Sequence, residues 1–371
     1  AALALALATL SKASIDYATS GLENPLTHLL LAGFLLLYTR KEQERAGPRW
    51  ILSLSLLTAL GMVNRMDTAL LFGPALAWAL VEAYRETRDW KTVGAAALGM
   101  APFVLWELFA LFYYGTPFPN TALAKLNAGL IPRAKIWSSG LTYLHNSLQV
   151  DPITLITIAL SLAVPVVARD WRKVLLSLGT LLYLAYVVRV GGDFMSGRFL
   201  SAPWFVAAFV LASTAWTTHR FPQVALSLVL ILVGLNAPYT PVRAFGGERA
   251  HKDADVWLWG RGITDERANY YVNTGLMRAL IGGRELPDHD WAISGREARE
   301  EGRQISVRGS VGFFGFFAGP EVHVIDILGL GDPLLARLPV TDPHWRVGHY
   351  GRRPPAGYEE TVESGENRIV D

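Results

Sequence analysis

The sequence predicts a polytopic α-helical membrane protein with a C-terminal extracytoplasmic α/β domain. Apolar runs recur through the first 238 residues, and charge is concentrated after them. Residues 239–371 hold 36 of the 66 Asp, Glu, Lys and Arg residues in the 371-residue chain. We therefore expect a transmembrane domain over residues 1–238 and a soluble domain over residues 239–371.

The apolar runs predict about eight full membrane spans and a partial first one over residues 1–10. They lie at about residues 25–38, 50–63, 68–84, 92–113, 153–168, 174–188, 199–215 and 222–237. Several are shorter than the roughly 20 residues that a span needs. Aromatic flanks such as Trp50, Tyr84 and Trp204 extend them, as at membrane interfaces. The chain begins with Ala1 inside an apolar run, so we expect its natural N-terminus to lie upstream.

Basic residues indicate the sidedness of the loops. Loops 40–49, 85–91 and 169–173 are rich in Lys and Arg, which favours the cytoplasmic side. The alternate loops, at 11–24, 64–67, 114–152 and 189–198, are poorer in basic residues for their length. The alternation places these loops and the C-terminal domain outside the cytoplasm. The unusual polar clusters of the membrane part would then share one face.

Two short clusters lie at the heads of predicted spans. In "SGLENPL", Glu23 is a candidate site residue because charge beside a membrane segment is costly. Ser20 and Glu23 also have the spacing of a helix-capping box, so capping is the alternative. In "NRMDTALL", Arg65 and Asp67 are candidates. The alternatives are that Asp67 caps a helix and that Arg65 extends to the interface.

Two longer clusters are more specific. In "FYYGTPFPNTALAK", two prolines shape the loop, and Asn120 and Lys125 are candidate binding residues. In "GGDFMSGR", the glycines permit turns, and the fork of Arg198 suits phosphate oxygens. Asp193 is a candidate pocket residue or a partner that orients Arg198. The alternative is an Asp193–Arg198 ion pair that merely closes a loop.

Several functions are not indicated. The chain has no Cys, which excludes disulfides and thiolate chemistry, and its net charge of +2 gives no case for nucleic acid. No metal-ligand spacing is present, so neither a metal nor another cofactor is expected. His28 and Glu107 lie within predicted spans, either as buried hydrogen-bonded groups or as cavity-lining ones. In the C-terminal domain we expect strands within 304–309 and 321–330 and a helix over 264–281, with Asp326 and Asp332 in capping or turn roles.

Taken together, these motifs resemble the GT-C superfamily of polytopic membrane glycosyltransferases. Within it, they are similar to the terminal arabinofuranosyltransferases of the actinobacterial cell wall. The motifs "GGDFMSGRF" and "FYYGTPFPNTALAK" discriminate best, with support from "SGLENPL", "NRMDTALL" and "VIDILGLGDPLLARLP". The resemblance covers most of the chain.

This resemblance implies an inverting transfer in a bacterial cytoplasmic membrane. The donor would be a sugar, in this group arabinofuranose, on a polyprenyl phosphate, and the acceptor an extracytoplasmic glycan. Arg198, Arg65 and Lys125 are the basic candidates for the donor phosphate. In this superfamily the catalytic carboxylate usually lies in the first outer loop, which we expect upstream of Ala1. The catalytic base is therefore not assigned, and a chain beginning at Ala1 would lack it. Replacing Arg198 by Ala is expected to weaken donor use with folding intact.

Two other functional classes compete with this one. The main alternative is a transporter or flippase for a lipid-linked or anionic solute, which discontinuous helices and midplane charges would favour. Polar clusters at one face and the lack of an internal repeat count against it. The other alternative is a membrane-anchored scaffold whose outer domain binds glycan without chemistry.

Overall fold

The computed structural model describes residues 2–40, 47–126, 129, 131–214, 220–240, 262–283, 287–342 and 346–370. The chain forms two compact units. Unit 1 comprises Ala1–Pro117 with Gly140–Phe245, and unit 2 comprises Phe118–Ser139 with Gly246–Asp371. Residues 118–139 therefore pack with the C-terminal segment, although the boundary expected from the sequence assigned them to the preceding domain.

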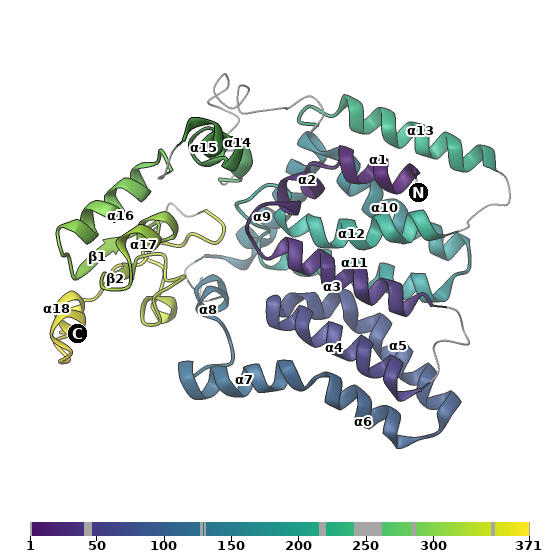
Figure 1. The fold of residues 1–371 in the computed structure, drawn as a ribbon, viewed down its shortest axis with the longest axis horizontal. Helices are drawn as coiled ribbons and strands as arrows, with labels where there is room; N and C mark the ends of the chain where they lie inside the picture. Colours follow the sequence, from purple (N-terminus) through teal and green to yellow (C-terminus); the bar gives the residue numbers. More distant parts are fainter. Residues whose placement is uncertain are drawn as a thin grey trace. The chain divides into compact units, whose positions relative to one another are not determined.

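Unit 1 consists of helices in the described residues, and every predicted apolar run falls on one or two of them (Figure 1). Helix α9 (Arg133–Val150) begins in unit 2 and ends in unit 1. The other elements are α1 (Ala2–Leu10), α2 (Lys12–Ala18), α3 (Asn24–Tyr38), α4 (Pro48–Asn64), the 3-10 helix η2 (Met66–Thr68), α5 (Ala69–Thr87), α6 (Trp90–Gly99), α7 (Ala101–Tyr114), α10 (Pro152–Val167), α11 (Trp171–Arg189), α12 (Arg198–Ser213) and α13 (Arg220–Asn236).

Fewer helices meet the length of a membrane span than the sequence led us to expect. Two described helical segments, Met66–Thr87 and Trp171–Arg189, are long and apolar enough to cross a membrane. Two bent pairs raise the number to four if each is one span: α6 with α7 at 47° and α9 with α10 at 110°. Helices α3 and α12 are apolar but shorter, below the roughly 20 residues of a straight span. Two to four candidate spans, rather than about eight, are thus supported by length and composition.

Helix α12 is the central element of unit 1. It packs against α1, α2, α3, α10 and α11, and most of its side chains are buried. The core beside it combines Leu7, Ile158, Trp204, Ala207 and Leu230 from four helices. Because α12 is enclosed in this way, its first residue, Arg198, is held in a fixed position relative to the neighbouring helices.

Glycines allow close helix contacts elsewhere in unit 1. A Cβ at Gly99 of α6 would lie 2.5 Å from the Ser55 Cβ of α4. A Cβ at Gly179 of α11 would lie 2.5 Å from the Leu71 carbonyl oxygen of α5. Small residues at helix crossings are typical of helix packing in membranes, where backbone approach and van der Waals contact supply the stability.

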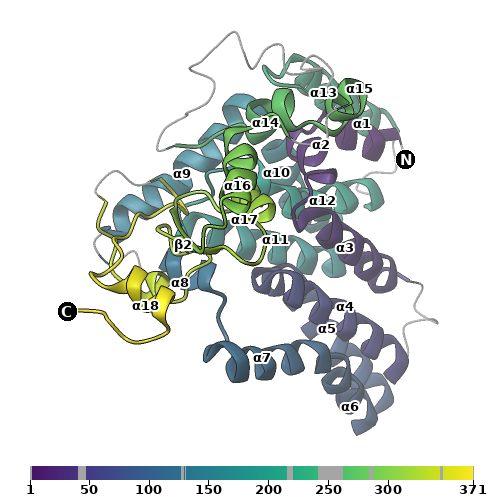
Figure 2. The same ribbon diagram turned by 60° about the vertical axis from the view of Figure 1, so that its left-hand side comes forward.

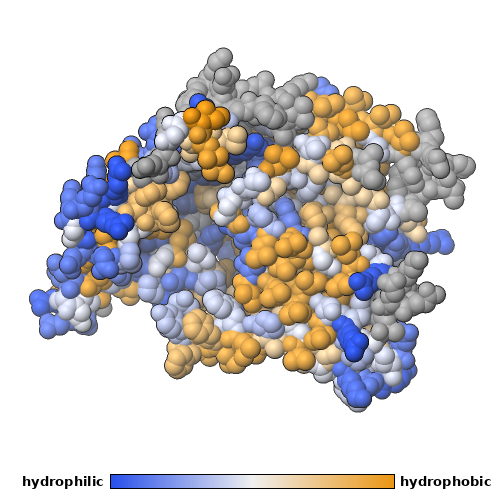
Figure 3. All heavy atoms as spheres, viewed as in Figure 1, coloured by the Kyte–Doolittle hydropathy of each residue, from blue (hydrophilic) through white to orange (hydrophobic). Residues whose placement is uncertain are grey.

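Unit 1 also carries a large apolar surface. On the face in Figure 3, hydrophobic residues gather over α3, α4 and α13. Large side chains are exposed along these and other helices, among them Leu29, Leu36 and Leu232, while Phe112 of α7 is 91% exposed. Apolar patches of this extent mark an interaction surface, and a membrane fits the candidate spans among these helices.

Unit 2 joins the C-terminal segment to α8 (Asn120–Leu126). Strands β1 (Ile305–Arg308) and β2 (His323–Asp326) pair in parallel, with Ile305 opposite His323. Helix α17 (Gly312–Ala318) connects them and packs on α16 (Asp290–Glu300), as Figures 1 and 2 show. The remaining elements are α14 (Glu266–Thr274), α15 (Leu276–Gly282), the 3-10 helix η4 (Leu335–Arg337) and α18 (Tyr358–Ser364). Both predicted strands are present, and the helix expected over 264–281 is broken at Gly275.

Candidate functional site

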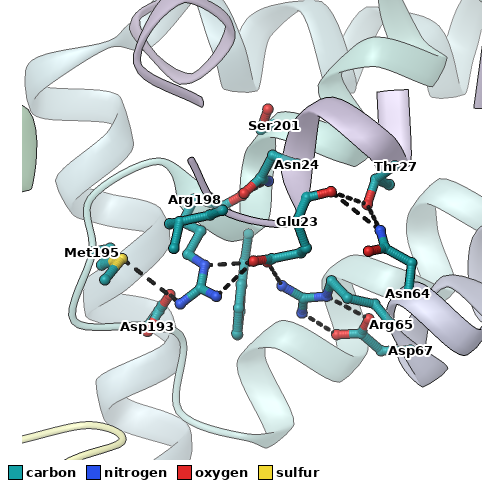
Figure 4. Close-up of polar contacts among 12 residues, drawn as sticks. Glu23, Asn24, Thr27, Asn64, Arg65, Asp67, Asp193, Met195, Arg198 and Ser201 are labelled. Carbon is teal, nitrogen blue, oxygen red and sulfur yellow. Dashed lines mark hydrogen bonds and ion pairs between the residues drawn. The ribbon is translucent and has the colours of Figure 1, made fainter. Parts of the chain in front are cut away.

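Three loops of unit 1 meet through a set of charged side chains (Figure 4). Glu23 immediately precedes α3, and Arg65 and Asp67 lie between α4 and α5. Asp193 lies between α11 and α12, and Arg198 is the first residue of α12. Ion pairs connect these five residues in the order Asp67, Arg65, Glu23, Arg198, Asp193. We call them the ion-pair network. The structure thus brings together five of the seven site residues that the sequence predicted.

Glu23 is the centre of the ion-pair network. Its Oε1 accepts hydrogen bonds from Arg65 Nη1 at 2.6 Å and from Arg198 Nε at 3.2 Å. Its Oε2 accepts one from Arg198 Nη2 at 2.9 Å. The carboxylate therefore lies between two guanidinium groups and is bound to Arg198 by both oxygens, the geometry that makes Arg–carboxylate pairs strong and directional.

The two aspartates hold the outer ends of the network. Arg65 Nε donates to Asp67 Oδ1 at 2.9 Å, and Arg65 Nη2 donates to Asp67 Oδ2. Arg198 Nη1 lies farther from its aspartate, at 3.4 Å from Asp193 Oδ2. Asp193 Oδ1 is fixed by the backbone N–H of Phe194 at 2.9 Å. Each arginine is thus oriented from two sides.

An aromatic ring lies beside both arginines. The guanidinium carbon of Arg65 is 4.5 Å from the centroid of the Phe199 ring, and that of Arg198 is 5.9 Å from it. Phe199 itself is buried. Cations at this distance from an aromatic face are attracted to its π-electrons, and the ring keeps water away from one side of each guanidinium.

The electrostatics of the network keep Glu23 ionised. Burial alone would raise the pKa of Glu23, but hydrogen bonds from Arg198 and the positive charges of Arg198 and Arg65 outweigh it and lower the pKa to about 2. A carboxylate with so low a pKa is a weak proton acceptor near neutral pH. In this arrangement Glu23 is therefore an ion-pair partner and not a candidate general base.

The loop carrying Asp193 and Arg198 is anchored on both sides. Tyr143 Oη of α9 donates to the Met195 carbonyl at 3.0 Å and accepts from the Phe199 N–H at 3.0 Å. Tyr17 Oη of α2 donates to the Ser196 carbonyl at 2.9 Å. Gly192 lies against Tyr143 with a positive φ of 78°, a conformation that residues with a Cβ rarely adopt.

Gly192→Ala is accordingly expected to lower the free energy of unfolding of unit 1 by about 3 kcal/mol, from left-handed backbone strain and a steric clash. The added Cβ would lie 2.5 Å from Tyr143 Cβ, too close without movement of α9. Thermal unfolding of the detergent-solubilised protein measures the effect. Gly21→Ala is the matched control: Gly21 has φ +72° but no atom within 4 Å of a Cβ, so only the strain of about 1 kcal/mol applies. Equal losses in the two variants would contradict the close packing of Gly192 against Tyr143.

The structure also decides between the alternatives for these motifs. Ser20 and Glu23 form no capping box: Ser20 Oγ accepts from the Leu22 N–H, and the Glu23 side chain bonds the arginines. Arg65 does not extend away from the bundle, since its side chain is only 16% exposed and pairs with two carboxylates. The Asp193–Arg198 pair forms, but as one end of the larger network.

Sequence reasoning missed the amides that fix this site. Asn64 Nδ2 donates to the Glu23 carbonyl at 3.1 Å and to Thr27 Oγ1 at 2.8 Å. Asn24 Nδ2 donates to the Arg198 carbonyl at 3.3 Å. Asn24, Asn64 and Phe199 each adjoin a predicted site residue within the same motif. Their position next to a charged candidate was thus visible in the sequence, but only tertiary contacts distinguish these side chains from ordinary loop residues.

The other predicted residues have different surroundings. Asn120 is the first residue of α8 and Lys125 lies in its last turn, so both belong to unit 2 and neither is part of the ion-pair network. His28 is half-buried and hydrogen-bonded, with Nε2 2.8 Å from Ser201 Oγ and its ring stacked on Phe205. Glu107 lies on α7, and its Oε1 is buried without a hydrogen-bond partner.

Asp326 and Asp332 have the turn roles that the sequence predicted. Asp326 accepts from the N–H groups of Leu328 and Gly331, and Asp332 from those of Leu334 and Leu335. Within the described ranges, no group of three or more His, Cys, Asp or Glu side chains could hold a metal ion.

The fold and the site together define a class. The protein is mostly helical, with two to four candidate membrane spans, and its charged network lies where three interhelical loops meet. Buried ionisable residues beside membrane segments are expensive and generally functional. These properties are those of a helical membrane protein with a charged site at the ends of its helices.

Comparison with known proteins narrows this class. The chain is 30% identical over 222 residues to the terminal β-(1→2)-arabinofuranosyltransferase of Mycobacterium tuberculosis, covering 51% of this chain and 34% of that protein. It is 23% identical over 401 residues to the terminal β-(1→2)-arabinofuranosyltransferase of Corynebacterium glutamicum, covering 90% of this chain and 58% of that protein. No family model matches the chain, and no solved structure matches it. The chain thus spans between a third and three fifths of the length of these relatives, which are glycosyltransferases by name.

Proposed function

We propose that this protein is a membrane glycosyltransferase that moves a sugar, arabinofuranose, from a polyprenyl-phosphate donor to a glycan acceptor outside the bacterial cytoplasmic membrane. The observation that carries the proposal is the similarity to a terminal β-(1→2)-arabinofuranosyltransferase along 90% of the chain. The candidate membrane spans support it, because a polyprenyl tail is soluble only in the bilayer.

The ion-pair network suits the head group of such a donor. A glycosyl phosphate diester is anionic, and guanidinium forks bind phosphate oxygens in pairs. We assign the donor phosphate to Arg198 and Arg65, and the orientation of these arginines to Asp193 and Asp67. Arg198 Nη1 has its aspartate at 3.4 Å and the Met195 sulfur at 3.7 Å, so its present contacts are long ones. Among the N–H groups of the two arginines, Arg198 Nη1 would therefore gain most from a hydrogen bond to a phosphate oxygen.

The remaining roles follow the chemistry of the transfer. The acceptor hydroxyl attacks the anomeric carbon and loses its proton to a base, while the polyprenyl phosphate leaves with the bonding electrons on the opposite face. The result is inversion. Glu23, in its position between the arginines, is too strongly paired to be that base, so we place the base outside the ion-pair network. Asn120 and Lys125 are proposed to contact donor or acceptor from unit 2.

The sidedness of the loops completes the proposal. Residues 1–238 would be anchored in the membrane with the ion-pair network at its outer edge, apart from residues 118–139, which pack with the C-terminal segment. Residues 239–371 would then form the extracytoplasmic part. This arrangement brings a lipid-linked donor and a cell-wall glycan to the same side of the membrane.

A transfer assay tests the proposal. Membranes carrying the protein, with any sequence that precedes Ala1 in its gene, receive a labelled polyprenyl-phosphate arabinofuranose and a synthetic arabinan acceptor. We expect label in the glycan and release of one polyprenyl phosphate per sugar transferred. Arg303→Ala, which changes an exposed arginine of unit 2, is the control. Movement of intact donor across sealed vesicles, with no bond cleaved, would instead identify a transporter.

A further inference from the structure

The position of Glu23 between two arginines is the one that a phosphate would need. Its carboxylate oxygens accept from Nε and Nη2 of Arg198, the same pair of N–H groups that forks a phosphate. One of these oxygens also accepts from Arg65 Nη1 at 2.6 Å. An anion contacting both guanidinium groups from this side would therefore compete with Glu23 for the same hydrogen bonds.

The charge of the network makes this competition necessary. Its two guanidinium groups carry +2 and its three carboxylates carry −3, which leaves a net charge of −1. A phosphate diester would add a further negative charge in a partly buried site, where like charges repel strongly. Stable binding of the anion requires one carboxylate to leave the arginines.

Glu23 is the carboxylate best placed to move. The Asp193 side chain is fully buried, and a backbone N–H holds it. Asp67 is bound by both oxygens to Arg65, two residues away in the chain. Glu23 has the longest side chain of the three acids and is the most exposed, at 15%. Its backbone carbonyl stays anchored to Asn64 and Thr27, so the side chain can rotate without moving α3.

We infer that Glu23 is an intramolecular competitor of the anionic head group: its carboxylate holds Arg65 and Arg198 in binding geometry and swings aside when a phosphate takes its place. The identity of the lipid rests on the proposed function, whereas the competition rests on the contacts of Glu23. Glu23 is thus a positioning residue. It holds the two guanidinium groups in the geometry that binds a phosphate. It also lowers the affinity of the site for polyprenyl phosphate, so that this product can leave.

Binding of two probes to the purified protein in detergent tests this inference. The probes are a short polyprenyl phosphate and inorganic phosphate, titrated by calorimetry. Glu23→Gln keeps the size of the side chain but removes the competing charge, so we expect polyprenyl phosphate to bind at least about tenfold more tightly. Tighter binding of inorganic phosphate alone would assign the site to a free anion, with the competition upheld.

A matched variant separates competition from simple charge. Asp67→Asn removes the same charge from the network but leaves the Glu23 carboxylate in place between the arginines, so we expect less than about a threefold gain. An equal gain in both variants, or unchanged or weaker binding in Glu23→Gln, would overturn the inference. Absence of anion binding in every variant would overturn it as well.

A second substitution covers the case in which Glu23→Gln does not fold. Glu23→Asp keeps the charge but shortens the reach of the carboxylate, so it should bind polyprenyl phosphate with an affinity between those expected for wild type and Glu23→Gln. An affinity at or below wild type would overturn the inference. The two proposals fail differently: sugar transfer with no gain in Glu23→Gln removes only the competition, and a gain without sugar transfer removes only the enzymatic function.

Discussion

Replacing Arg198 by alanine is expected to abolish donor use and also to lower the free energy of unfolding of unit 1 by about 3 kcal/mol, the lower part of the range for breaking a buried ion pair. The Arg198 guanidinium pairs with Glu23 and Asp193, whose side chains are 15% and 0% exposed. Without it, Asp193 loses the cation of its ion pair. Chemical unfolding in detergent and donor turnover in membranes measure the two effects.

Arg198→Lys is the informative control for this prediction. Lysine keeps the positive charge but has no planar fork, so it should recover most of the stability while donor turnover stays low. From the sequence we expected Arg198→Ala to weaken donor use with folding intact. The contacts of Arg198 with Glu23 and Asp193 predict a loss of stability as well. Unchanged stability in Arg198→Ala would show that the network contributes nothing to the fold and would contradict its role in joining the three loops.

Replacing Arg352 by methionine is expected to disrupt unit 2, at a cost of at least about 4 kcal/mol from several buried carbonyls left without a donor. Arg352 is 3% exposed. Its guanidinium donates to the carbonyls of Leu338, Leu328 and Tyr350 at 2.8–3.0 Å, and to that of Ala124 in α8 at 2.7 Å. This last bond ties residues 118–139 to the C-terminal segment.

Limited proteolysis measures the effect of Arg352→Met. We expect cleavage within residues 118–139 at protease concentrations that leave the wild type intact, because α8 would lose its anchor. Arg353→Met is the matched control, since the neighbouring arginine is exposed and is expected to change stability by less than about 0.5 kcal/mol. Equal protease resistance of the wild type and Arg352→Met would contradict the anchoring role of Arg352.

The positions of the helices could be predicted because hydropathy is a local property. Each apolar run became helical, and even the bends have a local signal. Pro102 and Pro152 lie in the first turns of α7 and α10, where the chain changes direction. The number of straight spans could not be predicted, because the runs are short and their flanking residues do not show whether a helix continues or bends.

The residues of the ion-pair network could be singled out one by one in the sequence, but their contacts with one another could not. Glu23, Arg65 and Arg198 each stand out as charges at the heads of apolar helices, yet their sequence separations exceed 40 residues and only the packing around α12 brings them together. Likewise, nothing in "GRRPPAG" distinguishes the buried Arg352 from the exposed Arg353. The bond from Arg352 to Ala124 is one of the contacts that join residues 118–139 to the C-terminal segment.

The most direct test of the proposed function is the fate of the donor with purified protein. A donor labelled in both sugar and lipid is incubated with an arabinan acceptor and the protein, purified together with any sequence that precedes Ala1 in its gene. The products are separated and examined by NMR. We predict that the sugar appears in a new glycosidic bond of inverted anomeric configuration, that sugar-free labelled polyprenyl phosphate is released in equal amount, and that Arg198→Ala yields neither product. Recovery of intact donor with every acceptor offered, or cleavage undiminished in Arg198→Ala, would contradict the account.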